Sequence, residues 1–186
     1  MGRKASRPVV PVKTEAEIER MRQAGRIVAL ALQKIGDLIR PGITTRELDA
    51  AAEATIRGFS AAPAFLGYRG YPATACISLN DEVVHGIPGE RVVRDGDLVS
   101  VDLGAILDGW YADAAYTFAV GDVSAEAQRL MAAGRAALAA GIAAARAGAR
   151  VREIGAAVEG LVKQYGYTVV RDLCGHGIGR RLHEEP

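Results

Sequence analysis

Two aspartates on either side of a predicted hairpin turn are the residues of this sequence best placed to do chemistry. Asp108 and Gly109 form a two-residue hairpin signal between two apolar runs. If they form the turn, Gly104 faces Asp113 across the two strands. Side chains alternate faces along a strand, so Asp102, Gly104 and Asp113 share a face. The sequence therefore predicts two aspartates as diagonal neighbours, with centres roughly 7–8 Å apart and Gly104 leaving space between them.

This pair of carboxylates needs a counter-charge if its face points into the core, as we expect from the apolar residues around it. Those residues are Leu98, Val99, Val101, Leu103 and Ile106. Burying two like charges there would cost several kcal/mol or keep one carboxyl protonated. One or two divalent cations would resolve the conflict. Two alternatives remain: one aspartate faces solvent or pairs with an arginine, or a register slip of one residue separates the pair.

The three histidines all lie in segments that contain glycine or proline. His85 lies in Val-Val-His-Gly-Ile-Pro, His176 in Cys-Gly-His-Gly-Ile-Gly, and His183 in Arg-Leu-His-Glu-Glu-Pro. A single histidine is more often structural than catalytic, but glycines permit the close approach that sites require. An imidazole added to two carboxylates gives a mixed ligand set that suits Mn, Fe, Co or Zn. The nearby Cys174 is interpreted as a buried structural thiol.

Helices and strands alternate in blocks along the chain, which favours an α+β fold. Capping boxes begin two predicted helices, an Ala-rich run predicts a third, and a fourth follows a Gly-Ala-Arg break. The predicted helices span residues 14–40, 44–58, 124–147 and 151–165. The predicted strands span residues 75–79, 83–87, 98–107, 110–120 and 167–172.

Composition is that of an ordinary globular protein, with 49% hydrophobic residues and a net charge of +1 in 186 residues. This balance gives no sign of a nucleic-acid or membrane partner. Residues 1–13 lack the apolar stretch of a signal peptide and are predicted to be a disordered tail before a single domain, residues 14–186. We expect a cytoplasmic protein with reduced cysteines.

Several motifs, in order along the chain, resemble the type I methionine aminopeptidases of the pita-bread metallopeptidase family. They are Leu-Gly-Tyr-Arg-Gly-Tyr-Pro at 66–72, Cys-Ile-Ser-Leu-Asn at 76–80, Val-His-Gly-Ile-Pro at 84–88, Val-Asp-Leu-Gly at 101–104, Tyr-Ala-Asp-Ala-Ala at 111–115, Val-Arg-Glu-Ile-Gly at 151–155 and Cys-Gly-His-Gly-Ile-Gly-Arg at 174–180. The similarity covers nearly the whole chain after the tail.

The resemblance implies the pita-bread (creatinase/aminopeptidase) fold and removal of the initiator methionine from nascent polypeptides whose second residue is small. Asp102, Asp113 and His176 match residues that bind two divalent metal ions, and Asp113 matches the one that bridges them. His85 and His183 match histidines that contact the substrate and stabilise the reaction intermediate. The implied mechanism is metal-assisted hydrolysis, in which the ions lower the pKa of a water molecule.

The resemblance also assigns a pocket for the methionine side chain. Tyr68, Tyr71 and Cys76 match residues that line it. Leu182 stands where many relatives carry an aromatic residue, and Phe65 stands where some carry a cysteine. The partners implied are nascent N-termini, with the ribosome as a candidate contact, and we expect a monomer if the domain is complete.

The family pattern places two further glutamate ligands after the His-Glu-Glu-Pro segment, beyond residue 186. We therefore expect the pita-bread fold to be incomplete at its C-terminus. We also expect weak metal affinity and little activity in a polypeptide that ends at Pro186.

Two other hypotheses fit parts of the pattern. A prolidase or X-Pro aminopeptidase shares the aspartate and histidine motifs, although such proteins usually carry an additional N-terminal domain. A non-enzymic binding module could keep the same fold. Such modules typically lose their ligands, whereas Asp102, Asp113 and His176 are all present here.

Overall fold

The computed structural model describes residues 10–185 and divides into two compact units. One contains the chain up to Gly121 together with the segment from His176, and the other is Asp122–Gly175. A disordered tail is predicted over residues 1–13, and residues 1–9 of it lie outside the described residues. The single domain predicted over residues 14–186 stays a prediction.

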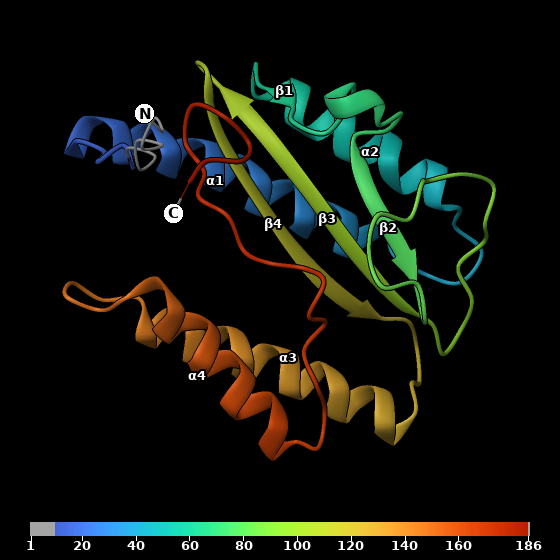
Figure 1. Cartoon of the computed structure of the whole chain (residues 1–186). Helices are drawn as coiled ribbons and strands as arrows, with labels where there is room; N and C mark the ends of the chain where they lie inside the picture. The colour runs from blue at the N-terminus through green and yellow to red at the C-terminus, as the bar shows by residue number, and fades with distance from the viewer. Residues whose placement is uncertain (1–9, 186) are drawn as a thin grey trace, which may run out of the picture. The chain divides into compact units, whose positions relative to one another are not determined.

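An antiparallel sheet forms the centre of the first unit (Figure 1). Strand β3 (Leu98–Leu107) pairs along its whole length with β4 (Trp110–Ala119). Its other edge pairs with β2 (Ala75–Leu79) and with the short β1 (Ala62–Pro63). Every residue of β2 is buried, so this strand joins the main core to the opposite face of the sheet.

The β3–β4 hairpin has the register that the sequence predicts. Asp108 and Gly109 form the turn with φ angles of 50° and 76°, the left-handed conformation that a tight hairpin turn requires. Gly104 lies directly opposite Asp113, as predicted. Aspartate and glycine both tolerate positive φ, and this local chemistry is what made the register readable from the sequence.

Two helices cover one face of this sheet. They are α1 (Glu15–Leu38) and α2 (Thr45–Gly58), and α1 contacts both strands of the hairpin. Both predicted capping boxes are present, formed by Thr14 with Glu17 and by Thr44 with Glu47. Helices on one face of an antiparallel sheet confirm the predicted α+β class.

The main core lies between these helices and the sheet. Alternate residues of β3 point into it and are fully buried: Val99, Val101, Leu103 and Ala105. From the helices, Val28, Ala31, Ile35, Leu48 and Ile56 belong to the same cluster. This packing fixes which face of β3 is left for the polar residues in between.

The second unit is a pair of helices. Helix α3 (Ala125–Ala144) packs on α4 (Val151–Gln164), and Gly141 allows Val158 to approach closely. A Cβ on Gly141 would lie 3.1 Å from Val158 Cγ2. None of the described helices is long and apolar enough to cross a membrane.

The predictions of two strands and of a buried Cys174 thiol are wrong. Residues 83–87 are not a strand, because His85 has a left-handed φ of 62° that interrupts an extended ladder. Residues 167–172 also form no strand, since no strand of residues 10–185 pairs with them. Cys174 is exposed rather than buried, and Cys76 is buried; both are free thiols.

Candidate metal centre

Asp102 and Asp113 share one face of the hairpin, as predicted, but that face lies opposite the main core. The apolar residues on either side of Asp102, Val101 and Leu103, point into the core under α1. The prediction of a core-facing pair is therefore wrong, because alternation along β3 sends the aspartates the other way. Both side chains are half-buried.

A second, smaller apolar cluster partly covers this face. It contains Ala64, Phe65, Cys76 and Leu182, with Tyr68, Tyr71, Ile106, Tyr111 and Ile178 packed against it. Cys76 is the direct cross-strand partner of Asp102. A Cβ on Gly104 would lie 2.9 Å from Ala64 Cβ and 3.0 Å from a Phe65 ring carbon. Gly104 therefore makes room for this cluster, in addition to the predicted space between the carboxylates.

The surroundings of the two carboxylates disfavour their ionised forms. Burial, with the Asp113 charge as second cause, raises the pKa of Asp102 to about 6. Burial also raises the pKa of Asp113, while His176 and His183 act in the opposite direction. Two half-buried carboxylates with raised pKa values form a site where a cation is stabilised.

His176 comes from the C-terminal segment and lies beside Asp113. Its Nε2 is 3.6 Å from Asp113 Oδ2, and its side chain is 31% exposed. Its Nδ1 lies 2.9 Å from the Gly177 carbonyl oxygen, which accepts when that nitrogen carries the proton. In that tautomer Nε2 has a free lone pair directed to the side of the ring where Asp113 lies.

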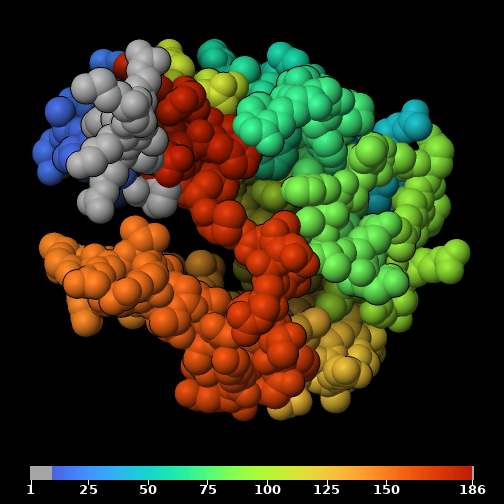
Figure 2. All heavy atoms as spheres, in the orientation of Figure 1, coloured from blue at the N-terminus to red at the C-terminus, as the bar shows by residue number. Residues whose placement is uncertain are grey.

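His183 stacks on Tyr68, and its ring lies tilted against that of His176. Its ring centroid lies 4.3 Å from that of His176 and 5.4 Å from that of Tyr68. The Tyr68 hydroxyl is 2.9 Å from His183 Nδ1. Burial and the neighbouring His176 lower the pKa of His183, which favours a neutral imidazole. The space-filling view in Figure 2 shows the C-terminal segment (red) beside the segment around residues 60–75 (green).

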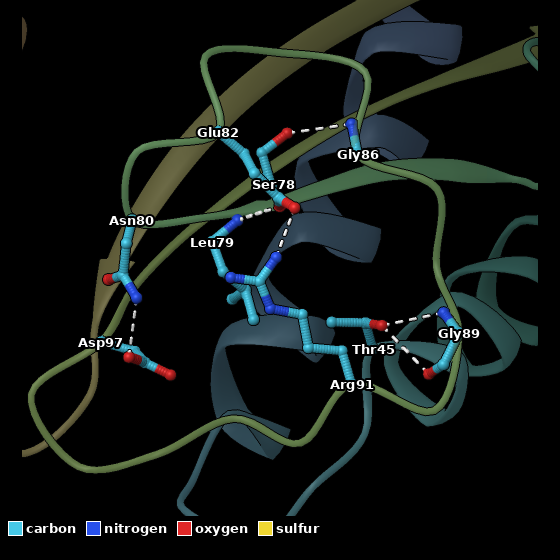
Figure 3. Close-up of polar contacts among 9 residues, drawn as sticks. All are labelled: Thr45, Ser78, Leu79, Asn80, Glu82, Gly86, Gly89, Arg91 and Asp97. Carbon is cyan, nitrogen blue, oxygen red and sulfur yellow. Dashed lines mark hydrogen bonds and ion pairs between the residues drawn. The ribbon is translucent and has the colours of Figure 1, made fainter.

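A polar network holds Gly86, the residue that follows His85 in the sequence, against β2 (Figure 3). Ile77 N–H donates to the Gly86 carbonyl, and Gly86 N–H donates to Ser78 Oγ. Both backbone polar groups of Gly86 are therefore held by β2. Glu82 accepts from Leu79 N–H and forms an ion pair with Arg91. His85 lies close enough to Asp102 for its charge to lower the pKa of that carboxyl.

The three residues predicted to line a side-chain pocket gather in the small cluster beside Asp102. Tyr68 belongs to the 3-10 turn η1 (Tyr68–Gly70), and the Tyr71 hydroxyl donates to the carbonyls of Ala75 and Gly86. Burial raises the pKa of the Cys76 thiol, which keeps it neutral. Leu182 and Phe65 lie in the same cluster.

The donor set fits a divalent ion in chemistry, with two carboxylates and one imidazole converging on one face. Among the described residues, no three side chains of the His, Cys, Asp and Glu types already stand as a ready-made metal-binding group. The 3.6 Å between His176 Nε2 and Asp113 Oδ2 is a separation that two atoms bound to one ion can have.

Sequence reasoning missed two residues that organise the site, Lys13 and Glu184. Lys13 Nζ lies 2.7 Å from Glu184 Oε2, across a separation of 171 residues. The only sequence signal was the position of Glu184 directly after His183. No local pattern could have identified its lysine partner.

Comparison with known proteins adds an independent observation. Residues 19–186 match the metallopeptidase family M24. The methionine aminopeptidase of Clostridium acetobutylicum is 45% identical over 179 residues, which is 96% of this chain and 72% of that protein.

Solved structures agree with this match. The crystal structure of methionine aminopeptidase from Rickettsia prowazekii superposes with a TM-score of 0.94 at 39% identity, over 96% of this chain and 72% of that one. An X-Pro aminopeptidase from Thermotoga maritima gives a TM-score of 0.78 at 26% identity, over 94% of this chain and 48% of that one. These similarities confirm the pita-bread fold.

Proposed function

Because the chain belongs to metallopeptidase family M24, we propose that it is a metal-dependent aminopeptidase that releases methionine from the N-termini of nascent polypeptides. One observation carries the proposal: the hairpin presents Asp102 and Asp113 on one face beside His176, and a small apolar cluster adjoins them. The relatives named methionine aminopeptidase are more similar to this chain than the X-Pro aminopeptidase is.

We propose that Asp102, Asp113 and His176 hold two divalent ions. Bound in this way, such ions would supply a nucleophilic hydroxide near neutral pH and polarise the scissile carbonyl. The carboxylates would provide the negative charge that the ions neutralise, which relieves the burial cost that raises the pKa of Asp102. His176 would provide the nitrogen donor.

His85 and His183 then orient the substrate. When the Tyr68 hydroxyl donates to His183 Nδ1, the imidazole proton lies on Nε2. A neutral imidazole in this tautomer donates a hydrogen bond to a carbonyl oxygen and to the negative charge that develops there. The loop network fixes His85 beside Asp102, where it can donate to the substrate amide.

The small apolar cluster provides the binding site for the methionine side chain. Tyr68, Tyr71 and Cys76 supply aromatic edges and a neutral thiol, surfaces that suit an unbranched thioether. Phe65 and Leu182 limit the size of this region.

The test compares two peptides with the purified chain and added Mn²⁺ or Co²⁺. We expect slow, metal-dependent release of methionine from Met-Gly-Met-Met and no cleavage of an X-Pro peptide. Asp113→Asn should abolish release. Asp108→Asn removes the same charge from the exposed turn and should leave release unchanged. Cleavage of the X-Pro peptide with Met-Gly-Met-Met intact would replace this proposal with the prolidase alternative.

Metal content is measured separately by calorimetric titration. We expect two equivalents of divalent ion in the unaltered chain and weaker binding in Asp102→Asn. Complete absence of divalent-ion binding would support the non-enzymic binding module instead.

A further inference from the structure

A nearly buried ion pair joins Lys13, the residue before the N-cap of α1, to the segment that carries two of the site histidines. Lys13 Nζ lies 2.7 Å from Glu184 Oε2, with side-chain exposures of 20% and 4%. An exposed surface pair contributes little, but removal of one partner from a buried pair leaves a charge without compensation. The chemistry of this pair therefore differs from that of a second lysine–glutamate pair within residues 10–185, Lys163 with Glu159, whose lysine is 60% exposed.

The second oxygen of Glu184 organises the turn before it. Glu184 Oε1 accepts the backbone N–H groups of Arg180 and Arg181, at 2.8 Å and 3.1 Å. The chain also passes close to both members of the ion pair at Gly179. A Cβ there would lie 2.8 Å from Glu184 Oε2 and 2.8 Å from Lys13 Cε. The turn is thus wound around the Glu184 carboxylate, and Lys13 supplies the only positive charge that bonds to it among the described residues.

This turn is closed by a short antiparallel bridge between Gly177 and Glu184. Each donates its N–H to the carbonyl of the other, at 2.9 Å and 2.8 Å. The residues immediately before them in sequence are His176 and His183, whose ring centroids lie 4.3 Å apart. Tyr111 N–H donates to the Gly179 carbonyl and ties the same turn to β4, two residues from Asp113.

We propose that Lys13 and Glu184 are positioning residues for His183 and His176. Lys13 compensates the buried carboxylate, the carboxylate fixes the turn at Arg180 and Arg181, and the turn sets the placement of both imidazoles. Neither residue of the pair lies among the groups assigned to the substrate or the metal. The catalytic meaning of the inference rests on the proposed function, whereas the positioning itself does not.

The first test reads the imidazoles directly and needs no activity. The chain contains three histidines, so its ¹H–¹³C spectrum holds three imidazole Cε1–H signals, one for each histidine. In Lys13→Met at pH 7.5 we expect the His176 and His183 signals to shift and broaden while the His85 signal stays in place. Glu184→Gln should move the same two signals, because an amide offers one acceptor atom where the carboxylate offers two. Lys163→Met is the matched control, and all three signals should keep their positions in it.

Two outcomes would overturn the proposal. The first is that all three signals stay in place in both Lys13→Met and Glu184→Gln. The second is that all three move together, which would indicate general destabilisation. Lys13→Arg keeps the charge and should restore the native positions of His176 and His183; it also serves if Lys13→Met does not fold.

Kinetics supply the second readout. With Met-Gly-Met-Met as substrate, Lys13→Met should lower kcat about tenfold or more, because small displacements of a catalytic group have effects of this size. KM should change less than kcat, since Phe65, Tyr71 and Cys76 of the apolar pocket lie outside this turn. Equal loss through KM alone would contradict positioning of His183. If the unaltered chain releases no methionine, the proposed function fails, and the imidazole spectra still decide the role of the ion pair.

Discussion

At the scale of single residues, the site contains two kinds of sensitive position: half-buried carboxylates, and glycines that have no room for a side chain. Asp102 and Asp113 carry charge on a half-buried face, and Gly86 and Gly104 lie where any larger residue would meet its neighbours. Each of these positions gives a substitution whose effect on stability or geometry has a definite sign.

Asp102→Asn should stabilise the metal-free chain. Burial and the Asp113 charge raise the pKa of Asp102 to about 6, so at pH 7.5 the folded chain holds an ionised group that it disfavours. An asparagine removes that charge and should increase the free energy of unfolding by about 1–3 kcal/mol. Urea titration in the presence of EDTA measures this. The same variant should bind divalent ions more weakly, and a loss of stability in EDTA would contradict the argument that burial and the Asp113 charge disfavour the ionised Asp102.

Gly86→Ala should displace the loop that carries His85. The added Cβ would lie 2.3 Å from the backbone oxygen of Ile77, which cannot move without breaking the pairing of β2. We expect a loss of about 1–3 kcal/mol in unfolding free energy and a shifted His85 imidazole signal. Gly89→Ala is the control, because its added Cβ meets no atom within 4 Å. Equal effects of the two substitutions would show that the contact with Ile77 is not the cause.

At the scale of elements, features set by neighbouring residues could be predicted from the sequence, whereas strand pairing with distant residues could not. The hairpin was predictable with its register, because Asp108 and Gly109 define the turn and alternation then places Asp102 and Asp113. The helices begin where the capping residues predicted. The strands predicted at residues 83–87 and 167–172 are absent, since β-branched residues favour a strand only where a neighbouring strand can pair.

The capping box of α2 should contribute measurably to the free energy of unfolding. Thr44 Oγ1 accepts the Glu47 N–H, and the Glu47 carboxylate accepts the Thr44 N–H. Thr44→Ala removes the cap and should lower the free energy of unfolding by about 1 kcal/mol. Thermal unfolding followed by circular dichroism measures the change. Thr55→Ala, a substitution within the same helix that removes no cap, should cost less.

At the scale of the whole molecule, burial is distributed unequally between the described helices. Helix α1 has five buried residues, whereas α4 has none. Backbone amides of helices with little tertiary burial exchange through low-energy openings. We therefore expect amide hydrogen exchange in α4 to be faster than in α1, measured by mass spectrometry of peptic fragments. Slower exchange in α4 would contradict this order.

Acid stability should depend on the contact that joins the two ends of the first unit. The Lys13 hydrogen bond, with backbone donors from Arg180 and Arg181, lowers the pKa of Glu184 below its ordinary value of 4.5. A lowered carboxyl pKa gives stability that is present above pH 4.5 and is lost as the pH falls through the folded-state value. Glu184→Gln should flatten the dependence of unfolding free energy on pH in this acid window. A dependence identical in both proteins would assign the acid transition to other carboxyls.

The two-residue turn at Asp108 and Gly109 has a consequence for how this hairpin can vary among related sequences. Substitutions along β4 alter one side chain at a time, but an insertion or deletion of one residue in the turn changes the parity of every position after it. Asp113 would then leave the face of Asp102 although both aspartates remained in the sequence. Turn length is therefore expected to be under stricter selection than most strand residues, and counting residues between two aspartates is a better indicator of a retained site than finding the aspartates alone.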